Sequence, residues 1–238
     1  MRASFQAPSE RAVGQAPQGV LPAVPQQVTP TLKSHARHVS LKAGQILFHK
    51  GDASDGCYWI NRGILKATSM SPSGEERILG LLGPGEVVGE LAMLDEGPRS
   101  ATVQAIRPSE LYFVARNGLN ALFLTDSALL QQLLDTLVRR LRKADEEAAA
   151  SFQPIGVRVT KALVEMMNLF GEKEDPAGRV VVTRHLRQTD IAALAGVSRE
   201  SVTRVIASLK RQGVLEQMGR FSYRIDCVRL EREAQGQQ

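Results

Sequence analysis

The sequence predicts an α+β protein with an N-terminal β-roll, a long central helix and a C-terminal winged helix-turn-helix. Three patterns along the 238 residues support this prediction. Short β-type runs alternate with glycine turns between residues 40 and 113, as expected for a small barrel or roll. Leucines at heptad spacing follow. Two short helical segments then flank a Gly-Val-Ser turn and precede a hairpin pattern.

The chain divides into four expected regions. Residues 1–30 are rich in Pro, Gln and Ala without an apolar period, so we expect a disordered tail. Residues 31–125 form the roll, residues 126–151 the central helix and residues 152–238 the winged unit, because Pro154 and Gly156 interrupt the helical pattern. Strands of the roll are expected at 45–49, 57–60, 64–69, 77–82 and 100–106.

The central helix carries a narrow apolar seam. Asp126 is a good N-cap, and the helix is expected to run to about residue 149. An amphipathic helix packed within the chain is one interpretation, but spacing of four and three over about three heptads favours pairing with a second copy. Such self-pairing gives a two-fold homodimer. The expected seam residues are Leu130, Leu134, Leu137, Leu141, Ala144 and Ala148.

The C-terminal region has the order of a winged helix-turn-helix. A helix at 157–170 and a loop at 171–178 precede a strand at 180–182. Thr189 is expected to cap a helix ending at residue 195, and a second helix covers 199–211. The hairpin joins 214–217 to 221–225 through a turn at Gly219.

The second helix of this motif separates apolar from polar residues. Val202, Val205, Ile206 and Leu209 share one side, whereas Arg199, Glu200, Thr203 and Arg204 lie on the other. A DNA recognition helix needs this division, because its back packs on the domain while its first turns reach base edges. Arg pairs with guanine and Glu accepts from cytosine. An ordinary solvated helix face is the alternative.

Positive charge is concentrated at the same end of the chain. Residues 179–238 hold eleven Lys and Arg against six Asp and Glu, while residues 31–151 hold fourteen of each. The surplus favours a polyanionic partner for the C-terminal unit, although a basic solvated surface would give the same count.

A second motif, VGELAMLDEGPRSATV, occupies residues 88–103. A Gly-Glu turn, a short helical segment and then Arg-Ser-Ala suit a cyclic phosphate. Arg99 would offer its guanidinium fork to the phosphate, aided by Ser100, while Glu90 accepts a hydrogen bond from a ribose hydroxyl. Taken alone, Glu90 and Arg99 fit a structural ion pair better.

Both motifs resemble those of one family. VSRESVTR at 197–204 is similar to the recognition segment of the cyclic-AMP receptor protein / fumarate-nitrate regulator (CRP/FNR) family of transcription regulators. The 88–103 string resembles the phosphate-binding cassette that this family shares with cyclic-nucleotide-gated channels and kinase subunits. The resemblance implies a cyclic-nucleotide-binding roll, with cyclic AMP or cyclic GMP as effector. The implied ligand residues are Gly89, Glu90, Leu91, Arg99, Ser100 and Ala101.

The resemblance also implies how DNA is read. In the family, residues matching Arg199, Glu200 and Arg204 read a TGTGA-type half-site, so a dimer would bind an inverted repeat. RNA polymerase is an expected further partner. The residues expected at DNA are Thr189, Ser198, Arg199, Glu200, Thr203, Arg204, Lys210 and Arg211.

One departure leaves the effector open. Positions that contact the purine in the cyclic-AMP receptor hold Ala144 and Asp145 here. Ala offers no hydrogen bond, and the Asp145 carboxylate suits a guanine edge as well as an adenine amino group. Asp145 is therefore kept as a candidate ligand residue. Cyclic di-GMP, a redox or haem signal, or no effector at all stay alternatives.

Other classes of protein fit the composition poorly. No apolar run approaches the roughly 18–20 residues of a membrane span, and no secretory signal begins the chain, so a cytoplasmic location is expected. Cys57 and Cys227 are too few for an iron–sulfur cluster or a disulfide framework and are expected to be reduced and buried. His35 and His38 lack partner ligands, so no metal is expected. No nucleophile–base set or kinase or cyclase motif indicates an enzyme or an enzyme subunit.

Overall fold

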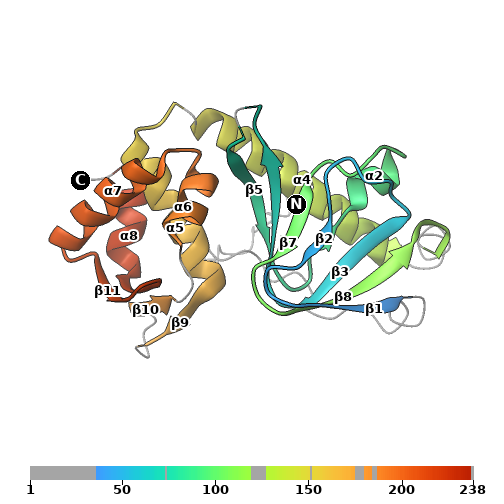
Figure 1. Ribbon diagram of the computed structural model, residues 1–238, viewed down its shortest axis with the longest axis horizontal. Coiled ribbons are helices and arrows are strands. Elements are labelled where there is room, and N and C mark those ends of the chain that lie inside the picture. Colours follow the sequence, from blue (N-terminus) through green and yellow to red (C-terminus); the bar gives the residue numbers. More distant parts are fainter. Residues whose placement is uncertain are drawn as a thin grey trace, which may run out of the picture.

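A β-roll and a mainly helical unit are joined by one long helix (Figure 1). The computed structural model describes the backbone of residues 36–72, 74–118, 127–150, 152–174, 180–183 and 187–236. The predictions for the 1–30 tail, His35, the Asp126 cap and residue 151 lie outside these ranges.

The roll consists of two four-stranded sheets in which all strand pairs are antiparallel. The first sheet has the order β1 (Arg37–Leu41), β8 (Ser109–Ala115), β3 (Gly56–Arg62) and β6 (Val87–Val88). The second has the order β2 (Ile46–Phe48), β7 (Thr102–Ala105), β4 (Leu65–Met70) and β5 (Glu76–Leu82). The inner faces meet in an aliphatic core in which Ile60, Leu65 and Leu111 have no exposed surface.

The helix α4 (Ser127–Ala150) has two different apolar sides. Leu129, Leu133 and Thr136 are at most 5% exposed, and Leu129 packs on the roll beside Trp59 and Met93. The predicted seam is uncovered in the single chain, because Leu130, Leu134 and Leu141 are 38%, 47% and 65% exposed. Ala144 and Ala148 are exposed and Leu137 is half-buried on the same side.

The C-terminal unit packs helices on a small sheet. Its sheet has the order β11 (Leu215–Gly219), β12 (Ser222–Asp226), β10 (Val180–Thr183) and β9 (Gly171–Lys173). Its helices are α5 (Ile155–Phe170), α6 (Gln188–Ala195), α7 (Arg199–Arg211) and α8 (Cys227–Ala234). One core is shared by the buried residues Leu163, Met166, Ile191, Val202 and Leu230. The separate β-roll and mainly helical unit confirm the α+β fold class predicted from the sequence.

Several local predictions differ from the structure. The strands β1 and β8 and the helix α8 were not predicted, and β9 lies where a loop was expected. The expected capping role of Thr189 is wrong. The N-cap of α6 is Arg187, whose side chain makes no capping bond, and Thr189 lies within the first turn. The Gly-Val-Ser turn is as predicted, with Ser198 capping α7 by accepting from the backbone N–H of Ser201 at 3.3 Å.

The two units share a contact at β5 (Figure 1). Ile78 and Leu81 of β5 are buried in the core of the C-terminal unit, together with Ile191 of α6. Lys66 of β4 forms an ion pair with Glu76 and lies 3.9 Å from the Asp190 carboxylate on α6. The first helix of the helix-turn-helix is therefore anchored on the roll.

Candidate functional site

The 88–103 motif forms a tight cassette between β6 and β7. Its short helix α2 (Glu90–Leu94) begins after Gly89, which has φ 81°. A Cβ on Gly89 would overlap the guanidinium of Arg99 and come within 3.3 Å of the Phe48 ring. Only glycine satisfies both the left-handed backbone and the close approach of the arginine.

Arg99 is held deep in the cassette. Its side chain is 3% exposed, and its Nη1 donates to the carbonyls of Gly56 and Gly89 at 2.8 Å each. The guanidinium lies 4.4 Å from the centre of the Phe48 ring. The nearest carboxylate, that of Asp55, is 3.7 Å from Nη2 and belongs to an exposed side chain.

One buried nitrogen of Arg99 makes no hydrogen bond within the described part of the chain. Among the described residues the buried Nε of Arg99 has no hydrogen-bond partner. Buried polar atoms are almost always paired, so an orphaned guanidinium donor is what an anionic ligand group would satisfy. The residues present therefore fit a bound phosphate.

The cassette carboxylate is tied to the long helix. Glu90 is 1% exposed and forms an ion pair with Arg140 of α4, which also donates to the carbonyl of Val87. The structure does not pair Glu90 with Arg99, so the simple ion-pair interpretation of these two residues is wrong. A change in the position of Glu90 would therefore alter a direct contact to α4.

The other predicted ligand residues surround these two or lie on α4. Leu91 is 45% exposed, Ser100 is exposed and Ala101 is buried. Ala144 and Asp145 are exposed on α4. Beneath the cassette, burial raises the pKa of the Cys57 thiol far above its ordinary value, so this cysteine stays protonated. Cys57 and Cys227 are both free and buried, as predicted.

The recognition helix presents the predicted residues to solvent. Val202, Ile206 and Leu209 are buried, while the predicted DNA contacts on α7 and its cap are exposed: Ser198, Arg199, Glu200, Thr203, Arg204, Lys210 and Arg211. Hydrogen bonds to its own backbone N–H and to Ser198 lower the pKa of Glu200, so its carboxylate is an acceptor at neutral pH. Thr203 is engaged already, because its hydroxyl lies 2.9 Å from Oε1 of Gln188.

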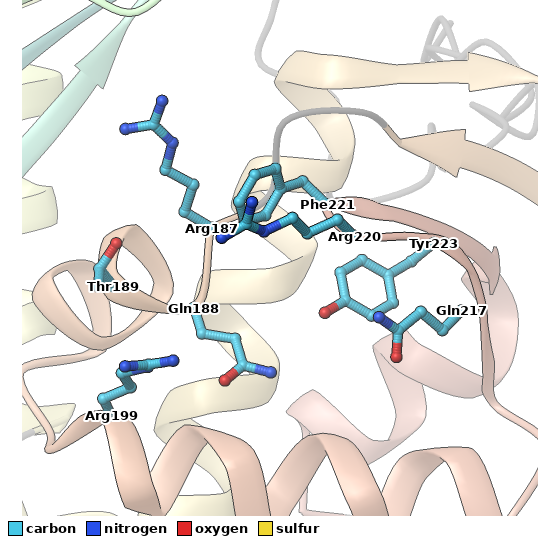
Figure 2. Close-up of a pocket in the computed structure, with 8 residues that line it drawn as sticks. All are labelled: Arg187, Gln188, Thr189, Arg199, Gln217, Arg220, Phe221 and Tyr223. Carbon is cyan, nitrogen blue, oxygen red and sulfur yellow. The ribbon is translucent and has the colours of Figure 1, made fainter.

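A hollow of about 430 Å³ lies between the helix-turn-helix and the hairpin. Figure 2 shows Arg220 and Phe221 of the hairpin on one side of it and Arg199 on the other. The sequence analysis did not single out most of its lining. The lining residues are Arg187, Gln188, Thr189, Arg199, Gln217, Arg220, Phe221 and Tyr223.

Comparison with known proteins assigns both units of the chain to known domain families. Residues 38–126 match the model of the cyclic nucleotide-binding domain, and residues 157–232 match that of the Crp-like helix-turn-helix domain. The chain is 30% identical over 217 residues to the CRP-like cAMP-activated global transcriptional regulator of Mycobacterium tuberculosis, covering 91% of this chain and 96% of the relative. The chain belongs to the CRP/FNR family. It is a DNA-binding transcription regulator.

Further members of the CRP/FNR family are similar. The cyclic AMP receptor protein of Thermus thermophilus is 36% identical over 173 residues, 72% of this chain and 76% of the relative. A solved CRP/FNR-family regulator from the same organism superposes with a TM-score of 0.72 at 25% identity, covering 85% of this chain and all of that one. The c-di-GMP-responsive regulator CLP of Xanthomonas campestris shares the fold, with a TM-score of 0.68 at 21% identity over 81% of this chain and 95% of that one.

Two residues that contact the cassette were missed from the sequence, and one of them had a usable signal. Arg140 continues the spacing of Leu129, Leu133 and Thr136, the side of α4 that faces the roll. Phe48 has no such local signal, because it reaches Arg99 across about fifty residues of chain. Within the described ranges no helix is long and apolar enough to cross a bilayer, and no three His, Cys, Asp or Glu side chains cluster as for a metal.

Proposed function

We propose that this CRP/FNR regulator is a homodimer that binds an inverted-repeat operator. Its affinity for the operator would depend on a cyclic nucleotide bound in the roll. The observation that carries the effector part is the buried, unpartnered Nε of Arg99. A cyclic phosphate would accept from this atom and neutralise a guanidinium that now has one exposed carboxylate nearby.

The remaining ligand contacts follow from the cassette. Ser100 and the backbone at Gly89 and Ala101 would hold the phosphate, and Glu90 would accept from the ribose beside Leu91. Because Glu90 is already paired with Arg140, a ribose hydroxyl at Glu90 has to share or displace a contact to α4. Ligand in the roll would in this way bias the arrangement of α4, to the extent of its differential affinity for the two arrangements.

The dimer is proposed to form along the exposed seam of α4. Each seam leucine follows a roll-facing residue by one position, so the seam lies about 100° round the helix from the side that packs on the roll. Uncovered leucines at heptad spacing fit a second copy of the same helix, since each copy offers knobs and holes to the other. A two-fold pair of this kind would present two copies of α7 to two half-sites.

The operator is proposed to be TGTGA–six bases–TCACA. Arg199, Glu200 and Arg204 would read bases, while Thr189, Ser198, Thr203, Lys210 and Arg211 would meet the backbone. The exposure of these side chains and the ionised Glu200 carboxylate support this assignment. Selection from random duplexes with the purified protein tests this operator, and recovery of an unrelated sequence would contradict it.

RNA polymerase is proposed as the partner at the promoter.

The effector is proposed to be cyclic AMP or cyclic GMP. Relatives named for cAMP cover most of this chain, whereas the c-di-GMP-responsive neighbour supports the fold alone at its lower identity. Asp145 on α4 is the proposed contact to the base. Its carboxylate accepts from a guanine edge or from an adenine amino group.

Calorimetric titration with cyclic AMP, cyclic GMP and cyclic di-GMP tests the effector. We expect one of the first two to bind, and Arg99→Leu to abolish binding while the far-ultraviolet spectrum and unfolding midpoint stay near those of the wild type. Arg62→Leu is the matched control, because Arg62 is an exposed arginine of the same roll, at the end of β3. Equal affinity in the folded Arg99 variant would overturn the phosphate site.

A further inference from the structure

Two arginines from different units lie against the turn of the helix-turn-helix. Gly196 ends α6 with φ 62°, and a Cβ on it would overlap Nη1 of Arg77 and come within 2.9 Å of Nη2 of Arg158. Arg158 belongs to α5 in the same unit, whereas Arg77 belongs to β5 of the roll, the strand that faces the helical unit (Figure 1). The turn therefore receives one guanidinium from its own unit and one from the roll.

The C-terminal end of α6 explains why positive charge gathers here. The last carbonyls of a helix lack partners within the helix and carry partial negative charge. The helix α6 has no basic residue in its own last turn. Arg158 supplies the missing donor, because its Nη2 donates to the carbonyls of Ala195 and Gly196 at 2.7 Å each. Arg77 brings a second positive charge to the same place.

The charge of Arg77 is available for this contact. In the part of the chain that the structure describes, Arg77 has no carboxylate within the 4.0 Å of an ion pair. Arg77 also lies near α4, where burial raises the pKa of Glu147 against the opposing charges of Lys143 and Arg77. Lys143 in turn contacts Glu165 of α5 at 2.5 Å. Arg77 is therefore placed where the roll, the long helix and the helix-turn-helix meet.

The backbone that carries Arg77 is fixed relative to α6. Ile78, the next residue of β5, is 2% exposed and packs in the core of the C-terminal unit with Ile191 of α6. On the other side of the contact, Ser198 follows Gly196 by two residues and caps α7. A displacement of the turn would therefore carry the start of α7 with it.

We infer that Arg77 is a positioning residue for operator reading, which holds the turn at Gly196 and so sets the angle at which α7 enters the major groove. Bases are read from the first turns of a recognition helix, so a small tilt at that end removes contacts. The contact supports reading rather than blocking it, because Arg199, Glu200 and Arg204 stay exposed in this arrangement. This role rests on the DNA-binding function of the unit, but not on the TGTGA assignment or on a nucleotide effector.

Binding to two duplexes tests this role. Fluorescence anisotropy would be measured with the full chain on the duplex that the wild type selects from random sequences, and on a scrambled duplex of equal composition. Arg77→Gln should lower the preference for the selected duplex at least about fivefold, the cost of one lost base contact. Its affinity for the scrambled duplex, the salt dependence of that affinity and its unfolding midpoint should stay those of the wild type.

The controls separate positioning from a general loss of charge. Arg62→Gln removes the same charge from an exposed arginine of the same roll and should leave the preference unchanged. Arg77→Lys keeps a cation at the end of α6 and should restore most of the preference. Hydrogen exchange on the free protein gives a second measurement: the amides of 196–199 should exchange faster in Arg77→Gln, while those of α5 stay protected.

Three results would overturn the inference. One is a preference and an exchange pattern in Arg77→Gln equal to those of Arg62→Gln. Another is an equal loss on both duplexes with a weaker salt dependence, which would make Arg77 a direct phosphate contact. The third is a gain in affinity, which would show that the contact restrains α7. A wild type that prefers no sequence would refute the operator proposal alone, because hydrogen exchange would still show whether Arg77 holds the turn.

Discussion

Replacing Leu141 by Asp is expected to separate the proposed dimer. Leu141 is 65% exposed in the single chain, and it lies about 100° round α4 from the roll-facing Arg140 that precedes it. Full burial of a leucine side chain stabilises by roughly 1.5–3 kcal/mol, so covering the exposed part contributes roughly 1–2 kcal/mol per chain. Two-fold symmetry doubles this to roughly 2–4 kcal/mol, or roughly 30- to 700-fold in Kd. A buried, unpaired carboxylate in each chain adds a further penalty.

Sedimentation velocity over a range of protein concentrations measures this effect. The wild type should sediment as a dimer at micromolar concentration and Leu141→Asp as a monomer with an unchanged circular dichroism spectrum. Val228→Asp is the matched control, because Val228 is a 42% exposed apolar residue on α8, away from the seam. A wild-type monomer, or a Leu141→Asp variant that dimerises as tightly as Val228→Asp, would refute the assignment of the seam.

Two further predictions concern the cassette and the contact between the units. Gly89→Ala should abolish nucleotide binding and lower the free energy of unfolding by roughly 1–3 kcal/mol, because the φ of 81° at this position strains an alanine. Urea unfolding measures this effect, with Gly80→Ala as the control because a Cβ there meets nothing within 4 Å. Equal stability of the two variants would contradict the prediction. Burial raises the pKa of Asp190 despite the nearby Lys66, so the protonated carboxyl favours the folded state at low pH and this contribution is lost as the pH rises through the folded-state pKa. The stability of the wild type relative to Asp190→Asn should therefore fall between about pH 4 and neutrality, and a rise would show that the ion pair outweighs burial.

The fold class and the recognition helix could be predicted because their signals are local. Each of three signals lies within a short stretch of sequence: the heptad seam, the glycine turn with Ser198 as cap, and the apolar back of α7. The structure contains all three. The helix α8 also has a local signal that the sequence analysis missed, since Asp226 caps it by accepting from the N–H of Arg229. The helix α8 was overlooked because it directly follows the hairpin, at the end of the charged region.

Long-range partners could not be predicted from local pattern. The strand β1 pairs with β8 in a register that joins Arg37 to Phe113, and neither segment alternates clearly enough to be identified alone. The same limit applies to the cassette, where Glu90 pairs with Arg140 fifty residues later rather than with Arg99. Thr189 was misplaced for another reason: the chain enters α6 through Arg187 without a side-chain cap, so residue type gave the wrong start.

The contact of β5 with α6 gives the proposed effector site in the roll a direct structural connection to the helix-turn-helix. Ile78 and Leu81 lie in one core with Ile191. The helix α6 therefore cannot change its position relative to β5 without disturbing the packing against the second sheet of the roll. That sheet includes β7, which starts two residues after Ser100 of the cassette. A roll ligand that alters the affinity for DNA by some factor must itself be bound more tightly or weakly by the same factor when DNA is present. Titrating the nucleotide into the protein–operator complex would read the coupling free energy from the opposite end of the molecule.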